Sequence, residues 1–333
     1  MSFLLLEGIA MGLKFSAQDV RGIYNIIPTP ATPNAHHIDA DDTVNYEATY
    51  KLVNMLIDEG VDAILTNGTF GEGATLTEKE HIAFVAKVIE TAGGRVPVFA
   101  GATTLNTRDT IRRGKLFREM GATGLFLGRP MWCECDDNTI VGFYSDIATA
   151  LPDTPLIIYD NPEAFKGKLS PRVYSRLAGI PNIIASKYIA IGPQYLDDVE
   201  ACGDSIRLLP LDSDWYYARK WVGEKAPACW TGSGNCGMAV LRALKKAIES
   251  GDDAYALEIT RDIRYTYKTL FPHGSFKLFS LYNIPLEKAR FDAAGLVEAG
   301  PARPPYHHVP QDYLEGAREA GRRWAEINKK YSG

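Results

Sequence analysis

Short apolar runs recur along the whole chain, and each is followed by a turn and a longer amphipathic stretch. The lengths of the runs suit buried strands, and those of the stretches between them suit helices. Strands and helices in alternation are typical of parallel βα units. Eight runs follow this pattern, at residues 22–27, 63–66, 96–100, 124–127, 156–159, 183–187, 206–209 and 228–231. We therefore predict an α/β fold, a closed (β/α)8 TIM barrel.

Capping signals support the helices between these runs. Thr77 is followed three residues later by Glu80, a capping-box pattern at the start of an amphipathic stretch, and Gly93 lies where that helix would end. Ser170 followed by Pro171 is typical of an N-cap and a first helical turn.

The chain changes character after about residue 295. Residues 300–305 are rich in proline and predict an extended connector. Apolar positions beyond the connector are spaced by four and three residues, which predicts a helix with one apolar face: Tyr313, Ala317, Ala320, Trp324, Ile327 and Tyr331. We divide the chain into an N-terminal extension (1–19), a catalytic barrel (20–295) and a connector with a C-terminal helix (296–333). We expect this helix to pack on its own barrel, the alternative being an oligomer contact.

Composition and charge narrow the kinds of partner. The 36 Lys and Arg residues oppose 41 Asp and Glu residues, which gives a formal net charge of −5. A mildly acidic chain does not gather phosphate groups, so we expect small-molecule ligands and neither nucleic acid nor a membrane. The apolar residues 3–6 lack the basic flank of a signal peptide. Five cysteines, an odd and sparse set, indicate a reducing compartment, and we expect the cytoplasm.

Lys187 is the polar residue that points most directly to chemistry. It ends an apolar run that should lie in the barrel wall, where an ammonium group is costly to desolvate. Desolvation lowers the pKa of an amine, and a neutral amine can attack a ketone to form a Schiff base. From position alone, a structural lysine that pairs with a carboxylate or reaches the rim remains the alternative.

Two other features are predicted to share the mouth of the barrel with Lys187. Tyr159 ends the preceding run, and its phenol could relay protons there. The second run leads into residues 68–72 (Gly-Thr-Phe-Gly-Glu), whose backbone amides could cradle a carboxylate. Taken singly, a rim tyrosine and a tight turn explain the same residues.

Two further patterns carry no chemistry in our interpretation. Residues 232–237 match the letters of a dinucleotide-binding loop, but they follow the last run instead of the first, so we interpret them as a flexible rim beside Trp230. Cys133 and Cys135 are too close in sequence for the usual metal-ligand spacing, and the two adjacent histidine pairs point in different directions. We expect no metal.

Taken together, three segments resemble the dihydrodipicolinate synthase and N-acetylneuraminate lyase superfamily of class I aldolases: residues 68–77, residues 159–162 and Lys187. The resemblance covers nearly the whole barrel. It implies that Lys187 forms the Schiff base with pyruvate, that Tyr159 shuttles protons with the help of Thr69, and that Gly68 and the amides of Thr69 and Phe70 hold the pyruvate carboxylate. It implies no cofactor beyond this covalent imine, and it suggests homotetramers.

Departures from the superfamily pattern narrow the substrate. An arginine of dihydrodipicolinate synthases is replaced by Ala164, and a loop threonine by Phe70, so lysine biosynthesis is not expected. A closer resemblance is to the bacterial hydratase-aldolases of o-hydroxybenzylidenepyruvate and carboxybenzylidenepyruvate in naphthalene and phenanthrene breakdown. It is carried by residues 28–30, 161–166, 282–290 and 303–306. It implies that Trp230 stacks on the aromatic half of the substrate and that Asn283 hydrogen-bonds it.

We therefore expect a lyase that hydrates an arylidene pyruvate and cleaves it to an aromatic aldehyde and pyruvate. Trp132 is expected to line the apolar pocket with Phe70 and Trp230, and a ring carboxylate would need a cation, for which the candidates are Arg129, Lys166 and Lys168. Two alternatives stay open. An aldolase for sugar-derived 2-keto acids would need polar groups along the pocket, and a noncatalytic barrel would bind a keto acid without releasing an aldehyde.

Overall fold

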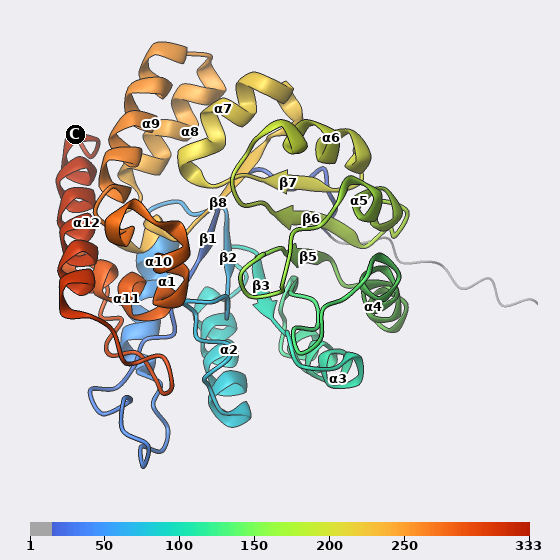
Figure 1. The fold of residues 1–333 in the computed structure, drawn as a ribbon, viewed down its shortest axis with the longest axis horizontal. Helices are drawn as coiled ribbons and strands as arrows, with labels where there is room; N and C mark the ends of the chain where they lie inside the picture. Colours follow the sequence, from blue (N-terminus) through green and yellow to red (C-terminus); the bar gives the residue numbers. More distant parts are fainter. Residues whose placement is uncertain (1–14) are drawn as a thin grey trace, which may run out of the picture.

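Eight parallel strands form the wall of a barrel in the computed structural model, which describes residues 15–333 (Figure 1). Residues 1–14, most of the expected N-terminal extension, lie outside the described residues. The strands are β1 (Gly22–Ile26), β2 (Ala63–Leu65), β3 (Val98–Gly101), β4 (Gly124–Leu127), β5 (Leu156–Tyr159), β6 (Ile183–Lys187), β7 (Arg207–Leu209) and β8 (Ala228–Thr231). Their order is β7-β6-β5-β4-β3-β2-β1-β8.

The barrel closes just beyond the end of β7. The Trp230 amide in β8 donates a hydrogen bond to the Pro210 carbonyl at 2.9 Å, and Leu211 bridges in parallel to Trp230. Each of the eight predicted runs corresponds to one of these strands, and the predicted TIM barrel is confirmed.

A helix follows each strand and covers the outside of the barrel (Figure 1). The capping signals act as predicted: Thr77 and Glu80 form a reciprocal capping box, Gly93 ends its helix in the left-handed region at φ 55°, and the Ser170 side chain accepts from the Val173 amide. The outer helices are α1 (Tyr46–Asp58), α2 (Glu78–Ala92), α3 (Thr107–Glu119), α4 (Asp137–Ala150), α5 (Pro171–Leu177), α6 (Pro193–Cys202), α7 (Asp212–Val222) and α8 (Ala239–Ser250).

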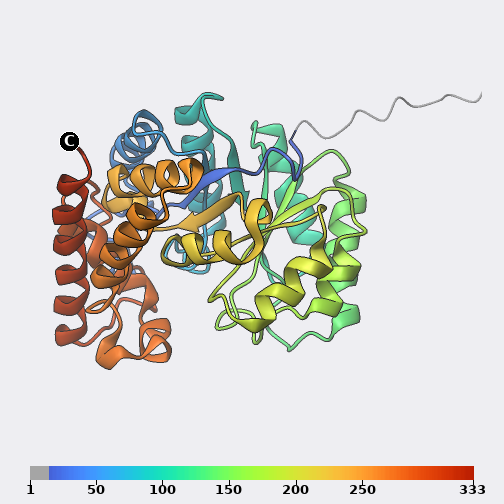
Figure 2. The same cartoon turned by 90° about the horizontal axis from the view of Figure 1, so that it is seen from above.

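Four helices follow the barrel: α9 (Asp253–Tyr267), α10 (Phe276–Leu281), α11 (Asn283–Ala294) and α12 (Gln311–Lys330). Figures 1 and 2 both show α12 at the outer edge of the molecule beside α9 and α11, which it contacts. Ala317, Ala320 and Trp324 of the predicted apolar face are buried. Because α12 also contacts α8, the last outer helix of the barrel, the expectation that this helix packs on its own barrel is confirmed. None of the helices in residues 15–333 is long and apolar enough to cross a membrane.

The rim predicted at residues 232–237 is not a loose segment. It contains a buried one-turn 3-10 helix, η2 (Ser233–Cys236). The Asn235 side chain donates to the carbonyls of Ile26 at 2.9 Å and Gly232 at 2.8 Å, and it accepts from the Asn25 amide at 3.0 Å. The prediction of flexibility was wrong because these long-range bonds satisfy the polar groups of the turn inside the protein.

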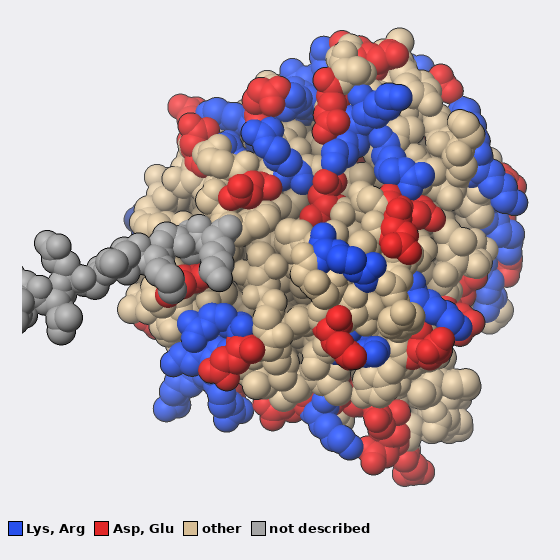
Figure 3. All heavy atoms as spheres, turned by 180° about the vertical axis from the view of Figure 1, so that it is seen from behind, with Lys and Arg blue, Asp and Glu red and all other residues tan. Residues whose placement is uncertain are grey.

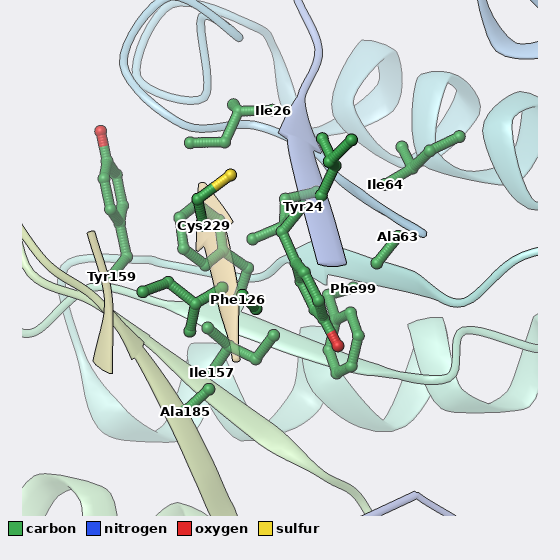
Figure 4. Close-up of a cluster of buried hydrophobic side chains, with 14 of the residues drawn as sticks. Tyr24, Ile26, Ala63, Ile64, Phe99, Phe126, Ile157, Tyr159, Ala185 and Cys229 are labelled. Carbon is green, nitrogen blue, oxygen red and sulfur yellow. The ribbon is translucent and has the colours of Figure 1, made fainter. Parts of the chain in front are cut away.

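Side chains fill the interior of the barrel. Tyr24, Phe99 and Phe126 pack there with small and aliphatic residues from the other strands, and all are buried (Figure 4). The Phe126 and Tyr159 rings lie 4.5 Å apart between centroids, and Figure 4 shows the Tyr159 hydroxyl pointing away from this packed layer. The side chains thus fill the interior of the barrel, and the Tyr159 hydroxyl lies at the carboxyl ends of the strands.

Both signs of charge are interspersed on the face drawn in Figure 3. This face has no large basic field of the kind that gathers phosphate groups.

Candidate active site

A cavity of about 410 Å³ opens at the carboxyl ends of the strands. Its walls come from the loops after the strands and from the segment between α9 and α11. The catalytic and substrate-binding residues implied by the family resemblance all line it: Gly68, Thr69, Phe70, Tyr159, Lys187, Trp230 and Asn283.

Lys187 ends β6 and is paired in register with Tyr159 of β5, so the two side chains are neighbours. Lys187 is only 3% exposed. Its ammonium nitrogen lies 3.7 Å from the centre of the Trp230 ring and 5.2 Å from that of Tyr159. Among residues 15–333, no carboxylate lies within salt-bridge distance of it. Burial lowers the pKa of Lys187 to about 7, although the charge of Asp160 acts in the opposite direction.

The Tyr159 hydroxyl is held by three polar groups. The Thr69 amide donates to it at 3.0 Å, the Thr69 hydroxyl lies 2.5 Å away, and the Asn161 side-chain amide donates to it at 3.2 Å. Asn161 also donates to the Thr69 hydroxyl at 3.0 Å. Because two N–H groups use the acceptor capacity of the phenol oxygen, its own hydrogen is directed to the Thr69 hydroxyl or into the cavity. Asn161 lies within the motif at residues 159–162, but the sequence analysis assigned it no role.

Buried ion pairs that the sequence analysis missed hold the loop 68–72 in place. Glu72 is fully buried and accepts from the Lys288 ammonium at 2.6 Å, from the Arg303 amide at 2.8 Å and from the Arg303 guanidinium. The Thr29 hydroxyl donates to the Gly71 carbonyl at 2.8 Å. A side chain at position 71 would come within 2.9 Å of the Asn67 backbone, so the tight turn requires glycine there.

Aromatic and aliphatic side chains form most of the remaining wall. The Trp230 indole donates to the Tyr188 carbonyl at 2.8 Å, which fixes its plane above Lys187. The Phe70 ring meets Phe291 edge-on at 5.4 Å between centroids. The far side of the cavity is lined by Leu270, Phe271, Phe276, Phe279, Leu281 and Ile284.

One aromatic prediction was wrong. Trp132 is 79% exposed and does not line the cavity, because the loop after β4 directs it outward. Within that loop, Met131 contributes to the wall instead.

The three cations proposed for a ring carboxylate also lie elsewhere. Arg129 is buried in an ion pair with Asp160 at 2.9 Å. The Lys166 ammonium donates to the Trp132 carbonyl at 2.6 Å, and that of Lys168 lies 3.8 Å from the centre of the Tyr188 ring. None of the three lines the cavity formed by the described residues.

A second polar network, also missed from the sequence, begins in the cavity wall and extends into the protein. Glu287 and Arg290 of α11 line the cavity and pair with each other at 2.8 Å. The network continues through Ser233 and Tyr267, which share a hydrogen bond of 2.8 Å, to Asp212, which accepts from Tyr267 at 3.1 Å. Burial raises the pKa of both Glu287 and Asp212.

The chain is similar to known proteins over nearly its whole length. Residues 23–320 match the dihydrodipicolinate synthetase family. The chain is 43% identical over 321 residues to the trans-2'-carboxybenzalpyruvate hydratase-aldolase of Nocardioides sp. (strain KP7), covering 95% of this chain and 96% of that one. It is 43% identical over 332 residues to the trans-O-hydroxybenzylidenepyruvate hydratase-aldolase of Pseudomonas putida, covering 98% and 100%.

A solved structure of PhdJ bound to a substrate intermediate superposes with a TM-score of 0.95 at 43% identity, and covers 96% of this chain and 100% of that one. The dihydrodipicolinate synthase of Aquifex aeolicus is more distant, with a TM-score of 0.78 and 25% identity over 94% of this chain and 98% of that one. These comparisons confirm the resemblance that the sequence motifs indicated.

Proposed function

The chain belongs to the dihydrodipicolinate synthetase family, and we propose that within this family it is a hydratase-aldolase of aromatic arylidene pyruvates. The protein adds water to the substrate and cleaves the adduct to an aromatic aldehyde and pyruvate. The observation that carries the proposal is a buried Lys187 amine with a lowered pKa, next to Tyr159 in a largely apolar cavity. The names of the relatives at 43% identity support the same activity.

The first step joins the substrate to Lys187. The neutral amine attacks the ketone carbon, and loss of water gives a protonated imine. This iminium is conjugated to the carbon–carbon double bond, so the carbon next to the ring becomes electrophilic. Water adds across the double bond. Its hydroxyl goes to the carbon next to the ring, and a proton goes to the neighbouring carbon, which restores the iminium.

The second step breaks the carbon–carbon bond. The new hydroxyl gives its proton to the hydrogen-bonded pair of Tyr159 and Thr69, which relays one proton on to the carbon of the enamine. As the proton leaves, the carbonyl of the aldehyde forms, and the electron pair of the broken bond moves into the iminium to give this enamine. Protonation of the enamine and hydrolysis of the imine release pyruvate and free Lys187. One covalent electron sink therefore serves both steps without a further cofactor.

We assign the binding groups in the same way. Gly68 and the backbone amides of Thr69 and Phe70 hold the pyruvyl carboxylate, as the family resemblance implies; all three residues line the cavity, and the carboxylate would replace the Tyr159 hydroxyl as partner of the Thr69 amide. Trp230 stacks on the aromatic half of the substrate, and Asn283 hydrogen-bonds it. The apolar far wall favours this arrangement over a sugar-derived substrate, which needs polar partners.

The cellular role is proposed from the same resemblance. The substrate and products are small molecules that arise in bacterial breakdown of naphthalene or phenanthrene. We propose a homotetramer that works in the cytoplasm; all five cysteines are unpaired, as expected for a reducing compartment. Light scattering on the purified protein tests the tetramer directly.

Borohydride trapping tests the central assignment. Incubation with pyruvate and borohydride should add one reduced pyruvyl group to Lys187, located by peptide mass spectrometry, and Lys187→Ala should abolish both trapping and cleavage of benzylidenepyruvate. Retained trapping in Lys187→Ala would move the Schiff base to another lysine. Binding of pyruvate without aldehyde release by the unaltered protein would favour the noncatalytic barrel.

A further inference from the structure

Glu287 of α11 is a buried carboxylate of the cavity wall that the steps above do not use. It lines the cavity and is only 7% exposed. One of its oxygens, Oε2, pairs with the Arg290 Nε at 2.8 Å and is closed to solvent there. Among residues 15–333, Arg290 is its only charged or hydrogen-bonding partner. A carboxylate can accept about four hydrogen bonds, so the other oxygen, Oε1, is left for a molecule in the cavity.

The ion pair with Arg290 fixes the orientation of this carboxylate. The Arg290 guanidinium donates to the Ser233 hydroxyl at 3.3 Å and lies 5.4 Å from the centre of the Tyr267 ring. Ser233 begins the buried turn η2, so the pair is attached to a rigid part of the barrel. Burial raises the pKa of Glu287, and the charge of Arg290 opposes this rise only in part. Glu287 is therefore held in place and is more basic than a glutamate on the surface.

The surroundings of Glu287 suit a water molecule. Asn283 lies one helical turn earlier on α11 and lines the cavity, and its Oδ1 has no hydrogen-bond partner in the part of the chain that the structure describes. Residues four positions apart on a helix are neighbours on one face, and two neighbouring acceptors can take both hydrogens of one water. The side-chain N–H groups of Asn283 stay available for the substrate. Figure 1 shows that α11 lies away from β5, which carries Tyr159.

The other groups of the wall that could accept a proton are less suited to this task. Glu163 is exposed, so bulk water solvates its carboxylate. Burial and the charge of Arg113 lower the pKa of His81 to about 4, which makes it a weak base. Tyr159 serves the cleavage step from β5. Glu287 is thus the buried carboxylate that the described part of the wall offers to a water molecule.

We propose that Glu287 is the general base of the hydration step and that Arg290 is the positioning residue that orients it. The inference rests on the proposed function and adds a catalytic residue to it. Oε1 takes one proton from a water molecule while the water oxygen bonds to the carbon next to the ring. The electron pair of the carbon–carbon double bond shifts by one bond, and the iminium on Lys187 becomes an enamine. Glu287 then returns the proton to the neighbouring carbon, which restores the iminium and the carboxylate.

Two substrates separate hydration from cleavage. Benzylidenepyruvate requires both steps, whereas 4-hydroxy-2-oxo-4-phenylbutanoate is already hydrated and requires only cleavage. Glu287→Gln keeps the shape of the side chain but cannot take a proton. We expect the single-turnover loss of the conjugated double bond of benzylidenepyruvate to slow about 10²-fold in this variant. Cleavage of the hydroxy acid should stay within about 3-fold, whereas Tyr159→Phe should slow it strongly.

Equal slowing of both substrates in Glu287→Gln, or an unchanged rate with benzylidenepyruvate, would overturn the role of Glu287. Glu163→Gln is the matched control, because it neutralises the exposed carboxylate of the wall and should leave both rates within about 2-fold. Failure of the unaltered protein to convert either substrate would instead overturn the proposed function.

A second variant keeps the test decisive if Glu287→Gln does not fold. Glu287→Asp retains the negative charge beside Arg290 but draws the carboxylate back by one methylene group. Hydration should still slow at least about 10-fold, because a base must reach the proton that it takes, while cleavage of the hydroxy acid and borohydride trapping with pyruvate persist. Normal hydration by Glu287→Asp, or parallel loss of hydration and cleavage, would contradict the assignment.

Discussion

At the scale of single residues, the site depends on how the surroundings of Lys187 lower the pKa of its amine. A lysine on the surface is protonated at neutral pH, whereas this one is enclosed by Trp230 and Tyr159 without a carboxylate among the described residues to hold its charge. The enclosing aromatic rings contribute little hydrogen bonding. The cost of desolvating the ammonium group therefore outweighs the attraction of Asp160, and the amine is available as a nucleophile.

The rate of imine formation should follow the ionisation of this amine. Because the pKa of Lys187 is lowered to about 7 and only the neutral amine attacks, the rate with pyruvate should rise about tenfold per pH unit below pH 7 and level off above it. Stopped-flow measurement of the single-turnover reaction between about pH 5.5 and 9 checks this. A rate that still rises steeply up to about pH 9 would mean that the lysine keeps a normal pKa.

Tyr159→Phe should separate the two halves of the reaction. The variant removes the hydroxyl that relays the proton but leaves the lysine and its enclosure, so cleavage should slow by about 10²- to 10³-fold while borohydride trapping of pyruvate persists. The Thr69 amide and Asn161 lose a shared acceptor, and Asn161→Ala is the matched comparison because it disturbs the same network but keeps the phenol. An unchanged turnover in Tyr159→Phe would remove its role as proton shuttle.

At the scale of elements, the loop 68–72 is connected to parts of the chain far away in sequence. Glu72 reaches Lys288 of α11 and Arg303 of the connector, and these partners lie 216 and 231 positions further along. The guanidinium of Arg303 also donates to the Thr43 carbonyl at 2.8 Å. The loop to which we assign the pyruvyl carboxylate comes early in the sequence, and segments near the C-terminus thus hold it in place.

Arg303→Met should destabilise the protein strongly. It leaves the buried Glu72 carboxylate with less compensating charge, and breaking a buried ion pair of this kind costs about 3–5 kcal/mol in the free energy of unfolding. Urea denaturation followed by circular dichroism measures the change. Arg322→Met is the control, because Arg322 pairs with Glu315 on the exposed side of α12 and its loss should leave the unfolding midpoint nearly unchanged. Similar midpoints for the two variants would contradict a stabilising role of the cluster.

The strands were predictable because parallel barrel strands are buried on both faces and therefore appear as apolar runs. Their ends were less well defined, as in the run predicted at 96–100, which is observed as Val98–Gly101. Lys187 and Tyr159 were found because polar residues that end such runs meet at one edge of the barrel. The partners of Glu72 were not found from the sequence, because no local pattern indicates which distant cation pairs with a buried carboxylate. The prediction for Trp132 was wrong for a similar reason. A loop has no periodicity that shows whether an aromatic side chain points into the cavity or to solvent.

At the scale of the whole molecule, the C-terminal segments complete both the wall and the support of the site. The segment between α9 and α11 lines the cavity with aromatic residues, and α12 covers α11 from outside. Trp324 of α12 is fully buried, and its indole donates to the Gly237 carbonyl at 3.0 Å, directly after η2. The packing of α12 thus reaches the turn that follows β8 and Trp230.

Trp324→Ala should therefore lower the stability of the whole barrel. Removal of a fully buried tryptophan costs about 3–5 kcal/mol through lost apolar contact and a residual cavity. Because α12 shares its core with α11 and η2, we expect one cooperative transition in urea, with loss of helix signal and of pyruvate trapping at the same, lowered midpoint. Trp221→Ala on α7, where the tryptophan is 49% exposed, is the matched control and should shift the midpoint little. If α12 melted in a separate, earlier transition while trapping persisted, the helix would be an appendage of the barrel instead of part of its folding unit.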